Sequence, residues 1–585
     1  MRCAILKTKV IRSFLLQVIL LALAHTSPLM TARGQTPAPP RFAVELIRVD
    51  AASLPALHSF SLGQADGKWL IVGGRTNGLH SFVESSNGGK TAPPNAFPSS
   101  QANTNIWVID PAQKKSWSAP VSDLPADCTG TGSPQYNCAD TLAANNAQYY
   151  QDGDTLYIIG GYGQNSKTGQ MTTFGSLTAI KVNEAINAII NGKPLAPFIQ
   201  QTTTYFDCPA SASNQYNSCV GTGNKQCKTG PGWADCQKRV AASCRLQRTS
   251  ATQTCVNKIQ SGQTEGLPTN TGYYAKVAGG GLERIGNTFY LVFGQQFEGL
   301  YSILESDYGK WPIKQVYTER ITAFQFKSDP LSAAVLNVIQ QDPSDATMPY
   351  HRRDLNVLPA LGPDGSQRIA VHGGVFVPGQ DAAYQEPILI ENGASPVNVR
   401  VTVDRSYQQL MSQYDCATLT MFDSGATGGG NMINVFFGGI SLYYVDPRTS
   451  KLKKDEGLPF INSITAMTHY ANGSWSEFFR RTPLDGRMGA DAKFIPNPAV
   501  AHADDGVIYL DRIKKVTLVG YIYGGIISDV GETGGDSQKF TRSSNALYEV
   551  RLEPSQKGLW NRAIPSTSLQ RTNKSVESNK APRNN

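Results

Sequence analysis

The feature that most constrains the fold is a strand pattern that recurs along the chain. A run of β-branched and aromatic residues ends in two glycines, and a loop and another apolar run follow. Complete copies occupy residues 69–74, 156–161, 369–374, 435–439 and 519–525. In a sixth, 289–294, one glycine is kept and Gln295 stands in place of the other. Such short runs bounded by turn residues are typical of strands, so the pattern predicts a repeated all-β architecture.

Partner strands and turns recur in the same way. Residues 106–111 and 442–447 both end in Asp-Pro, and 546–550 resembles a last copy. Tight turns at 152–154, 285–287 and 363–365 precede glycine pairs, and Asp-Gly supplies the positive φ angles that hairpins need. The composition agrees, because charged residues make up only 17% and glycine is abundant at 55 residues.

The diglycine strands and the strands that follow them resemble the kelch repeat. The resemblance covers residues 41–553 and implies a β-propeller, in which each repeat is a four-stranded blade around a central channel. It implies six irregular blades with enlarged loops, since the spacing exceeds the roughly 50 residues usual for kelch. Unassigned β-like segments at 330–350 and 387–412 leave a seventh blade open. Residues 42–49 alternate like a strand, and we expect them to close the ring on the last blade.

The two ends of the chain differ from the body at 35–553. Residues 1–34 have a basic start and the apolar run 14–24, which predicts a secretory signal peptide. That run is shorter than the roughly 20 residues of a membrane span, and no other segment predicts one. Residues 554–585 are basic and rich in Ser and Asn, which predicts a disordered tail. The expected location is therefore secreted, periplasmic or cell-surface.

The net charge of +8 does not indicate a nucleic-acid partner. Residues 1–34 and 554–585 each carry +5, so the body is left at −2. A nearly neutral body offers no broad positive field to a phosphate backbone.

The cysteines fit an exported protein, in which disulfides are permitted. Cys128 and Cys138 are close in sequence, and we expect them to pair. Six more lie in a Cys-rich insertion at 203–270 and leave 15 pairings open: Cys208, Cys219, Cys227, Cys236, Cys244 and Cys255. None has the C-x-x-C spacing of a zinc site, so no metal is predicted. Cys416 is left over in an apolar setting, which predicts a buried free thiol.

The long loops fall on the propeller face that also carries the connections between blades. Recognition is expected there, because loops on a rigid scaffold commonly bind ligands. We predict that residues opening the inner strands surround the channel mouth. The binding candidates are His58, Glu319, His351, Arg352, Arg353, Asp415 and His502. The arginines suit a carboxylate or phosphate, and the alternative is an internal Arg–Asp network that joins neighbouring blades.

The function that the sequence favours is a binding scaffold for a glycan or a protein partner, without a cofactor. It contains no Walker loop, H-E-x-x-H or G-x-S-x-G motif. The alternative is an enzyme acting on sugars, because the kelch resemblance extends to sialic acid mutarotases and galactose oxidase-like proteins. The oxidase type needs two His and two Tyr copper ligands, which the sequence does not match. The mutarotase type needs only one or two acid–base residues, for which the candidates are Arg352, Arg353, Asp415 and Glu319.

Overall fold

A computed structural model describes residues 39–563, apart from 51, 82–85, 88–89, 92–95, 133, 228–231, 301–313, 381, 394–397, 427, 447, 450, 534–536 and 555–558. The predicted signal peptide and residues 564–585 of the predicted tail lie outside the described residues. Among the described helices, none is long and apolar enough to cross a membrane.

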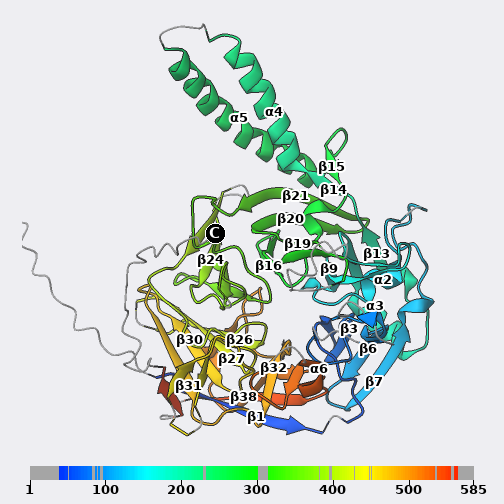
Figure 1. Ribbon diagram of the computed structural model, residues 1–585, viewed down its shortest axis with the longest axis vertical. Coiled ribbons are helices and arrows are strands. Elements are labelled where there is room, and N and C mark those ends of the chain that lie inside the picture. Colours follow the sequence, from blue (N-terminus) through cyan, green and yellow to red (C-terminus); the bar gives the residue numbers. More distant parts are fainter. Residues whose placement is uncertain are drawn as a thin grey trace, which may run out of the picture. The chain divides into compact units, whose positions relative to one another are not determined.

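Six of the sheets, each containing four antiparallel blade strands, form a β-propeller around a central channel (Figure 1). Each blade runs outward from an inner strand, and the blades follow one another in chain order. Blade 1 contains β2 (Ser61–Ala65), β3 (Lys68–Val72), β6 (Asn105–Asp110) and β7 (Lys115–Pro120). Blade 2 contains β8 (Gln148–Asp152), β9 (Thr155–Ile159), β12 (Leu177–Lys181) and β13 (Ile199–Thr202). Blade 3 contains β16 (Gly281–Ile285), β17 (Thr288–Val292), β20 (Arg320–Ser328) and β21 (Leu331–Gln340).

The remaining blades complete the ring. Blade 4 contains β22 (Asn356–Leu361), β23 (Gln367–His372), β24 (Ile388–Asn392) and β25 (Val399–Val403). Blade 5 contains β26 (Ala417–Asp423), β27 (Asn431–Phe437), β30 (Ile464–His469) and β31 (Trp475–Arg480). Blade 6 contains β33 (Lys493–Pro496), β35 (Thr517–Tyr523), β38 (Leu547–Pro554) and β1 (Phe42–Val49). The segments that left a seventh blade open belong to blades 3 and 4.

The ring closes as the sequence predicted. β1 pairs antiparallel with β38 over eight residues, from Phe42 opposite Pro554 to Val49 opposite Leu547. The predicted end of the body at 553 is too early, because β39 (Trp560–Arg562) pairs with the outer strand β31 of blade 5. The buried Trp560 indole packs on the Phe42 ring and donates a hydrogen bond to the Phe42 carbonyl at 2.8 Å. Both ends of the described chain therefore stabilise the closure of the ring at blade 6.

The repeated glycines follow the second strand of each blade and have a fixed geometry. In five blades the first glycine has φ between 63° and 76° and the second between 88° and 91°. In blade 3, Phe293 has φ 54° and Gly294 has φ 88°. The missing glycine is thus the first, and the expectation that Gln295 replaced the second is wrong. At Gly438 a side chain is excluded sterically, because an added Cβ would lie 1.9 Å from the Met488 carbonyl oxygen.

Short strands form additional small sheets on the loop-rich face. One sheet contains strands from the loops of blades 2 and 3: β10 (Tyr162–Asn165), β11 (Gln170–Thr173), β18 (Gln295–Glu298) and β19 (Lys314–Tyr317). Others are β4 (Ser86–Asn87) with β5 (Lys90–Thr91), β28 (Tyr443–Val445) with β29 (Leu452–Lys454), and β32 (Arg487–Ala490) with β36 (Ile526–Ser528) and β37 (Thr541–Ser543). The described parts of these loops therefore contain regular secondary structure.

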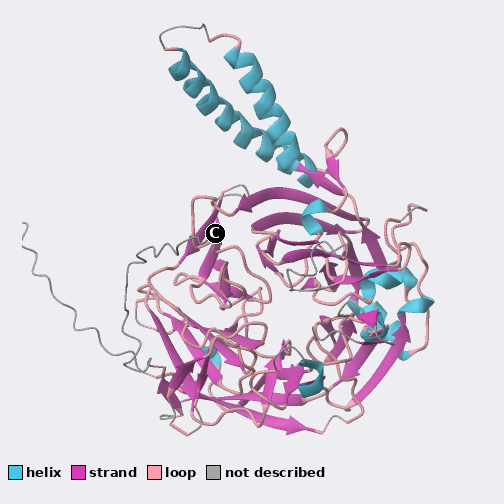
Figure 2. Cartoon of the chain, in the orientation of Figure 1, coloured by secondary structure: helices cyan, strands magenta, loops and turns pink. Residues whose placement is uncertain are grey.

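The remaining elements are the strand β34 (Ile508–Tyr509), which pairs parallel to β26, two strands in the insertion between blades 2 and 3, a pair of long helices and several short helices (Figure 2). The short ones are α2 (Cys138–Leu142), α3 (Val182–Ile190), α6 (Ser537–Phe540) and 3-10 turns at Ser99–Gln101, Val121–Asp123, Ala196–Phe198, Tyr273–Ala275 and Leu510–Arg512. The insertion between blades 2 and 3 contains β14 (Tyr205–Asp207), α4 (Cys208–Asn224), α5 (Trp233–Gln260) and β15 (Thr269–Asn270). β14 pairs parallel to β21 and so attaches the insertion to the edge of blade 3.

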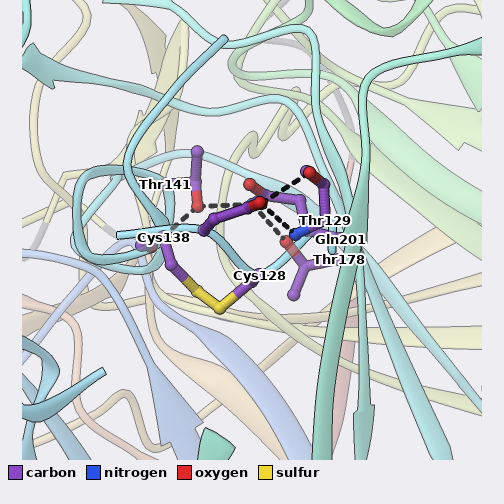
Figure 3. Close-up of a disulfide and its surroundings, with 7 residues drawn as sticks. Cys128, Thr129, Cys138, Thr141, Thr178 and Gln201 are labelled. Atoms are coloured by element: carbon purple, nitrogen blue, oxygen red, sulfur yellow. Dashed lines mark hydrogen bonds between the residues drawn. A yellow bond between two sulfur atoms is a disulfide. The ribbon is translucent and has the colours of Figure 1, made fainter. Parts of the chain in front are cut away.

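All eight predicted disulfide cysteines are paired. Cys128 bonds to Cys138, Cys208 to Cys255, Cys219 to Cys244 and Cys227 to Cys236. Cys416 is a buried free thiol, as predicted. The loop closed by Cys128 and Cys138 is attached to blade 2 by the buried Gln201, whose backbone N–H donates to the Cys128 carbonyl at 2.9 Å (Figure 3). The Gln201 side chain donates to Thr141 and Thr178, so the connection between blades 1 and 2 has a defined position.

Candidate site in the central channel

The chain turns through a left-handed conformation two residues before every inner strand. One residue per blade has φ between 45° and 65°, and these are Ser59, Asn146, Gly279, Asp354, Asp415 and Asp491. Asn and Asp tolerate this conformation better than other residues with a side chain. Backbone N–H groups donate to the equivalent carbonyl of the preceding blade, for example Gly279 to Asn146 at 3.0 Å and Asp354 to Gly279 at 2.7 Å. The repeat therefore places six equivalent positions around the channel mouth.

Blades 4, 5 and 6 all supply an aspartate at this position. Asp354, Asp415 and Asp491 line a small cavity of about 70 Å³ on the loop-rich face, together with His58 and Arg353. The other side chains that line it are mostly apolar or aromatic, including Leu79, Phe97, Tyr162, Phe297, Ile440 and Ile526. The fold thus gathers three carboxyl groups that are far apart in the sequence.

Asp491 is the best-bonded carboxyl group of the three. Its Oδ2 atom lies 3.1 Å from His58 Nδ1 and accepts the Ser59 hydroxyl, and its Oδ1 atom lies 3.7 Å from Lys493 Nζ. Burial alone would raise the pKa of Asp491, but the His58 hydrogen bond and the positive charge of Lys493 hold it well below its usual range. Asp491 is therefore an anion at neutral pH.

Asp415 has the opposite character. Burial raises the pKa of Asp415 well above its usual range, and the neighbouring charge of Asp491 raises it further. Both groups line the small cavity. Two adjacent carboxyl groups avoid a double negative charge by retaining one proton, and here that proton belongs on Asp415.

The third aspartate belongs to a chain of polar contacts that leads away from the channel. Arg353 donates to Asp354 and, at 3.2 Å, to the Tyr317 hydroxyl. Burial raises the pKa of Asp354, and the charge of Arg353 opposes this shift. His351 stacks on Tyr317 at 3.7 Å between ring centroids, and its Nδ1 atom lies 2.6 Å from Glu319 Oε1. Glu319 and His351 thus pair with each other outside the small cavity.

A larger cavity of about 360 Å³ continues along the channel between the six inner strands. Asp415 lines both cavities, so it lies at their junction. Most of the other polar groups are neutral amides and hydroxyls: Gln64, Gln148, Tyr149, Gln151, Asn356, Thr418 and Thr420. The volume falls within the roughly 300–1,000 Å³ typical of small-molecule sites.

The charged groups of this larger cavity are Lys493, Glu283 and Asp505. Burial would lower the pKa of Lys493, but the nearby Tyr149 and Asp491 outweigh it, so the ammonium group stays charged. Burial raises the pKa of Glu283 well above its usual range, and Asp505 raises it further. Burial also raises the pKa of Asp505. Glu283 Oε2 and Asp505 Oδ2 are buried without a hydrogen-bond partner in the protein.

Besides Glu319 and His351, two more of the predicted binding residues, Arg352 and His502, line neither cavity. Arg352 is fully buried and donates to the carbonyls of Pro349 and Gly373 at 2.7 and 3.1 Å. The Arg352 side chain thus contacts backbone carbonyls inside the fold, and these contacts are not the Arg–Asp network of the alternative interpretation. His502 does not open an inner strand as expected, because β33 begins at Lys493. It lies in the segment between β33 and β35 and contacts the Ala503 carbonyl at 2.8 Å.

The predicted residues that do meet at the mouth are His58, Arg353 and Asp415. The sequence analysis missed Asp354, Asp491, Lys493, Glu283 and Asp505. A signal was present, because Asp354, Asp415 and Asp491 each stand two residues before an inner strand. Aligning the inner strands would have revealed it, but those strands lack the glycines that mark the second strands. Within the described residues, no group of three or more His, Cys, Asp or Glu side chains is arranged to hold a metal ion.

Comparisons with known proteins yield a likeness in structure alone. No family model and no curated protein matches the sequence. Among solved structures, one titled "Structure of YjhT" is similar, with 10% sequence identity and a TM-score of 0.36. The match covers 87% of this chain and 98% of that one. The functional assignment below therefore depends on the site itself.

Proposed function

We propose that the protein is an exported binding protein whose central channel takes a neutral, polyhydroxylated ligand such as a sugar or the end of a glycan. The observation that carries this proposal is the charge state of the channel. Arg353 is paired with Asp354, Asp491 with His58 and Lys493, and Asp415 keeps its proton. An acidic sugar would require a cation that is not already paired with a carboxylate, whereas Arg353 is paired with Asp354 and Lys493 with Asp491.

The cavity wall supports a ligand rich in hydroxyl groups. Amides, hydroxyls and protonated carboxyl groups both donate and accept hydrogen bonds, as sugar hydroxyls do. Glu283 and Asp505 add two further carboxyl groups to this wall. The four disulfides support an oxidising location, and the diglycine geometry supports kinship with kelch-type propellers.

A thermal-shift and calorimetry panel tests this proposal with neutral hexoses and oligosaccharides, uronic and sialic acids, and amino sugars. A neutral sugar at about 100 times its dissociation constant stabilises the fold by roughly 2.7 kcal/mol. Glu283→Leu removes one or two hydrogen bonds to the ligand and is expected to weaken binding by about 10- to 100-fold. The same variant relieves a buried unpartnered carboxyl group, so the ligand-free fold should keep or gain stability.

The matched control is Glu265→Leu, which lies outside the channel. Loss of sugar binding in Glu283→Leu alone supports the channel site. Binding of acidic sugars without any neutral one contradicts the proposal, and so does unchanged affinity in Glu283→Leu.

A second candidate function is acid–base catalysis on the bound sugar. It is favoured by one observation, namely that the proton affinities of Asp415 and Asp491 are driven apart. Opening a sugar ring requires an acid to protonate the ring oxygen and a base to take the anomeric hydroxyl proton, while the ring C–O bond breaks and a carbonyl forms. Anomer exchange followed by NMR, with Asp415→Asn as the inactive variant, tests this candidate.

A further inference from the structure

The insertion between blades 2 and 3 is a helical hairpin held by three nested disulfides. Its helices α4 and α5 project away from the sheets (Figure 1). Cys208–Cys255 links them next to the propeller, Cys219–Cys244 links them farther out, and Cys227–Cys236 links them near the turn. We call residues Cys208–Gln260 the arm. Three cross-links in a short hairpin maintain its shape although it has little apolar core of its own.

The arm differs sharply in charge from the propeller that carries it. Residues 208–260 contain seven Lys or Arg and one Asp, a net charge of +6. The body at 35–553 has a net charge of −2, so the body without the arm has −8. The positive charge is therefore concentrated on the one element that projects from the fold.

The cations on α5 have a regular arrangement. Lys238, Arg245 and Arg248 are exposed and fall within about 80° of one another around the helix, at 100° per residue. With a rise of 1.5 Å per residue, Lys238 and Arg248 are separated by about 15 Å along the axis. Lys225, Arg239 and Lys258 are also exposed on the arm. This spacing fits a linear ligand with charges repeated along its length.

The arm lacks the features that other partners require. Its exposed large hydrophobic residues are Trp233 and Leu246, which are about 20 Å apart along α5 and form no continuous apolar face. A membrane-surface helix needs such a face, and a stable protein interface needs a desolvated apolar centre. The disulfides fit an oxidising compartment, where nucleic acid is not the expected polyanion.

We propose that the arm binds an anionic polysaccharide that carries carboxylate or sulfate groups. Arg245 and Arg248 offer planar guanidinium groups that match the geometry of these anions, and Lys238 adds a point charge. This site is separate from the channel. It binds an anionic ligand, whereas the channel favours a neutral one. The arm attaches the protein to a charged polymer while the channel binds sugar independently.

The test uses the full chain and two fluorescent polymers, a sulfated glycosaminoglycan and a polyuronate, in binding titrations at several salt concentrations. The arm variant is Lys238→Gln/Arg245→Gln/Arg248→Gln. The control variant removes the same charge from the propeller at three exposed positions, Lys193→Gln/Lys451→Gln/Lys514→Gln. Circular dichroism and a count of intact disulfides check that the arm still folds.

The arm variant is expected to weaken binding at least 10-fold at low salt, while the control stays within about 2-fold. At about 0.7 per neutralised charge, as for flexible polyanions, the slope of log K against log salt falls by about 2 in the arm variant. Equal losses in both variants would overturn the proposal, and so would the absence of binding to either polymer at low salt. Tighter binding to anionic vesicles, or salt-sensitive self-association without polymer binding, would assign the arm another partner and overturn it too.

Discussion

The assignment of one proton to Asp415 and of the negative charge to Asp491 makes a sharp prediction about two similar variants. Asp491→Asn removes the anion that faces His58, Ser59 and Lys493. Breaking a buried ion pair from one side costs about 3–5 kcal/mol. The Lys493 side chain is 25% exposed, so we expect the loss of unfolding free energy to lie near the lower end of this range, at about 3 kcal/mol.

Asp415→Asn should be nearly neutral. The amide replaces a carboxyl group that is already uncharged, and its NH₂ group donates to Asp491 in place of the proton. Asparagine also accepts the left-handed backbone that both positions adopt, with φ of 45° at 415 and 57° at 491. The two variants are therefore matched in shape and differ only in the charge that is lost.

Thermal unfolding measures the difference. At about 2.1 cal/mol/K per residue, roughly 520 folded residues give an unfolding entropy of about 1.1 kcal/mol/K. Near pH 4, where ionisation of the unfolded Asp415 costs little, Asp491→Asn should then lower Tm by about 3 °C, and Asp415→Asn should change it by less than about 1 °C. If Asp415→Asn is as damaging as Asp491→Asn, or if Asp491→Asn is neutral, the proton assignment is wrong.

The pH dependence follows with opposite signs for the two groups. Because the folded-state pKa of Asp415 is raised, its contribution to stability is present below the ordinary aspartate pKa of about 3.9 and is lost as pH rises through the folded-state value. Because the pKa of Asp491 is lowered, its contribution is present above about 3.9 and is lost as pH falls toward the folded-state value. Asp415→Asn should therefore gain stability relative to the wild type as pH rises. A parallel pH profile for the two proteins would contradict this reasoning.

Three further predictions concern the fold. Gly438→Ala, where the new Cβ meets the Met488 carbonyl, should cost more than about 2 kcal/mol by thermal unfolding, whereas Gly153→Ala in an open turn should cost only about 1 kcal/mol; equal costs would argue against the close approach. Trp560→Ala should lower the free energy of unfolding by about 3–5 kcal/mol and speed proteolysis of β1, because Trp560 packs on Phe42. An unchanged rate of proteolysis would show that Trp560 does not hold β1 in place. The Cys416 thiol, whose pKa burial raises to about 12, should resist alkylation until the protein unfolds, as checked by mass spectrometry of its peptide, and rapid labelling of the native protein would show that it is accessible.

The sequence by itself determined the propeller and the closure by β1, and it predicted six blades while leaving a seventh open. The reason is local, because a glycine pair after an apolar strand reports a backbone conformation that few residues adopt. It also predicted that eight cysteines pair and that Cys416 stays free. It did not show that the insertion is helical, since α5 places polar residues around most of its surface and has no clear apolar period.

Only the tertiary structure decided the site. Asp354, Asp415 and Asp491 lie on three blades, and nothing local marks them, because their inner strands carry no glycine pair. Arg352 and Arg353 are adjacent in sequence, yet one is buried between blades and the other faces the channel, which only the packing resolves. The pKa shifts likewise come from burial and from neighbours that are distant in the chain, such as His58 beside Asp491. A repeat fixes its own conformation locally, whereas the chemistry in the channel arises where six repeats meet.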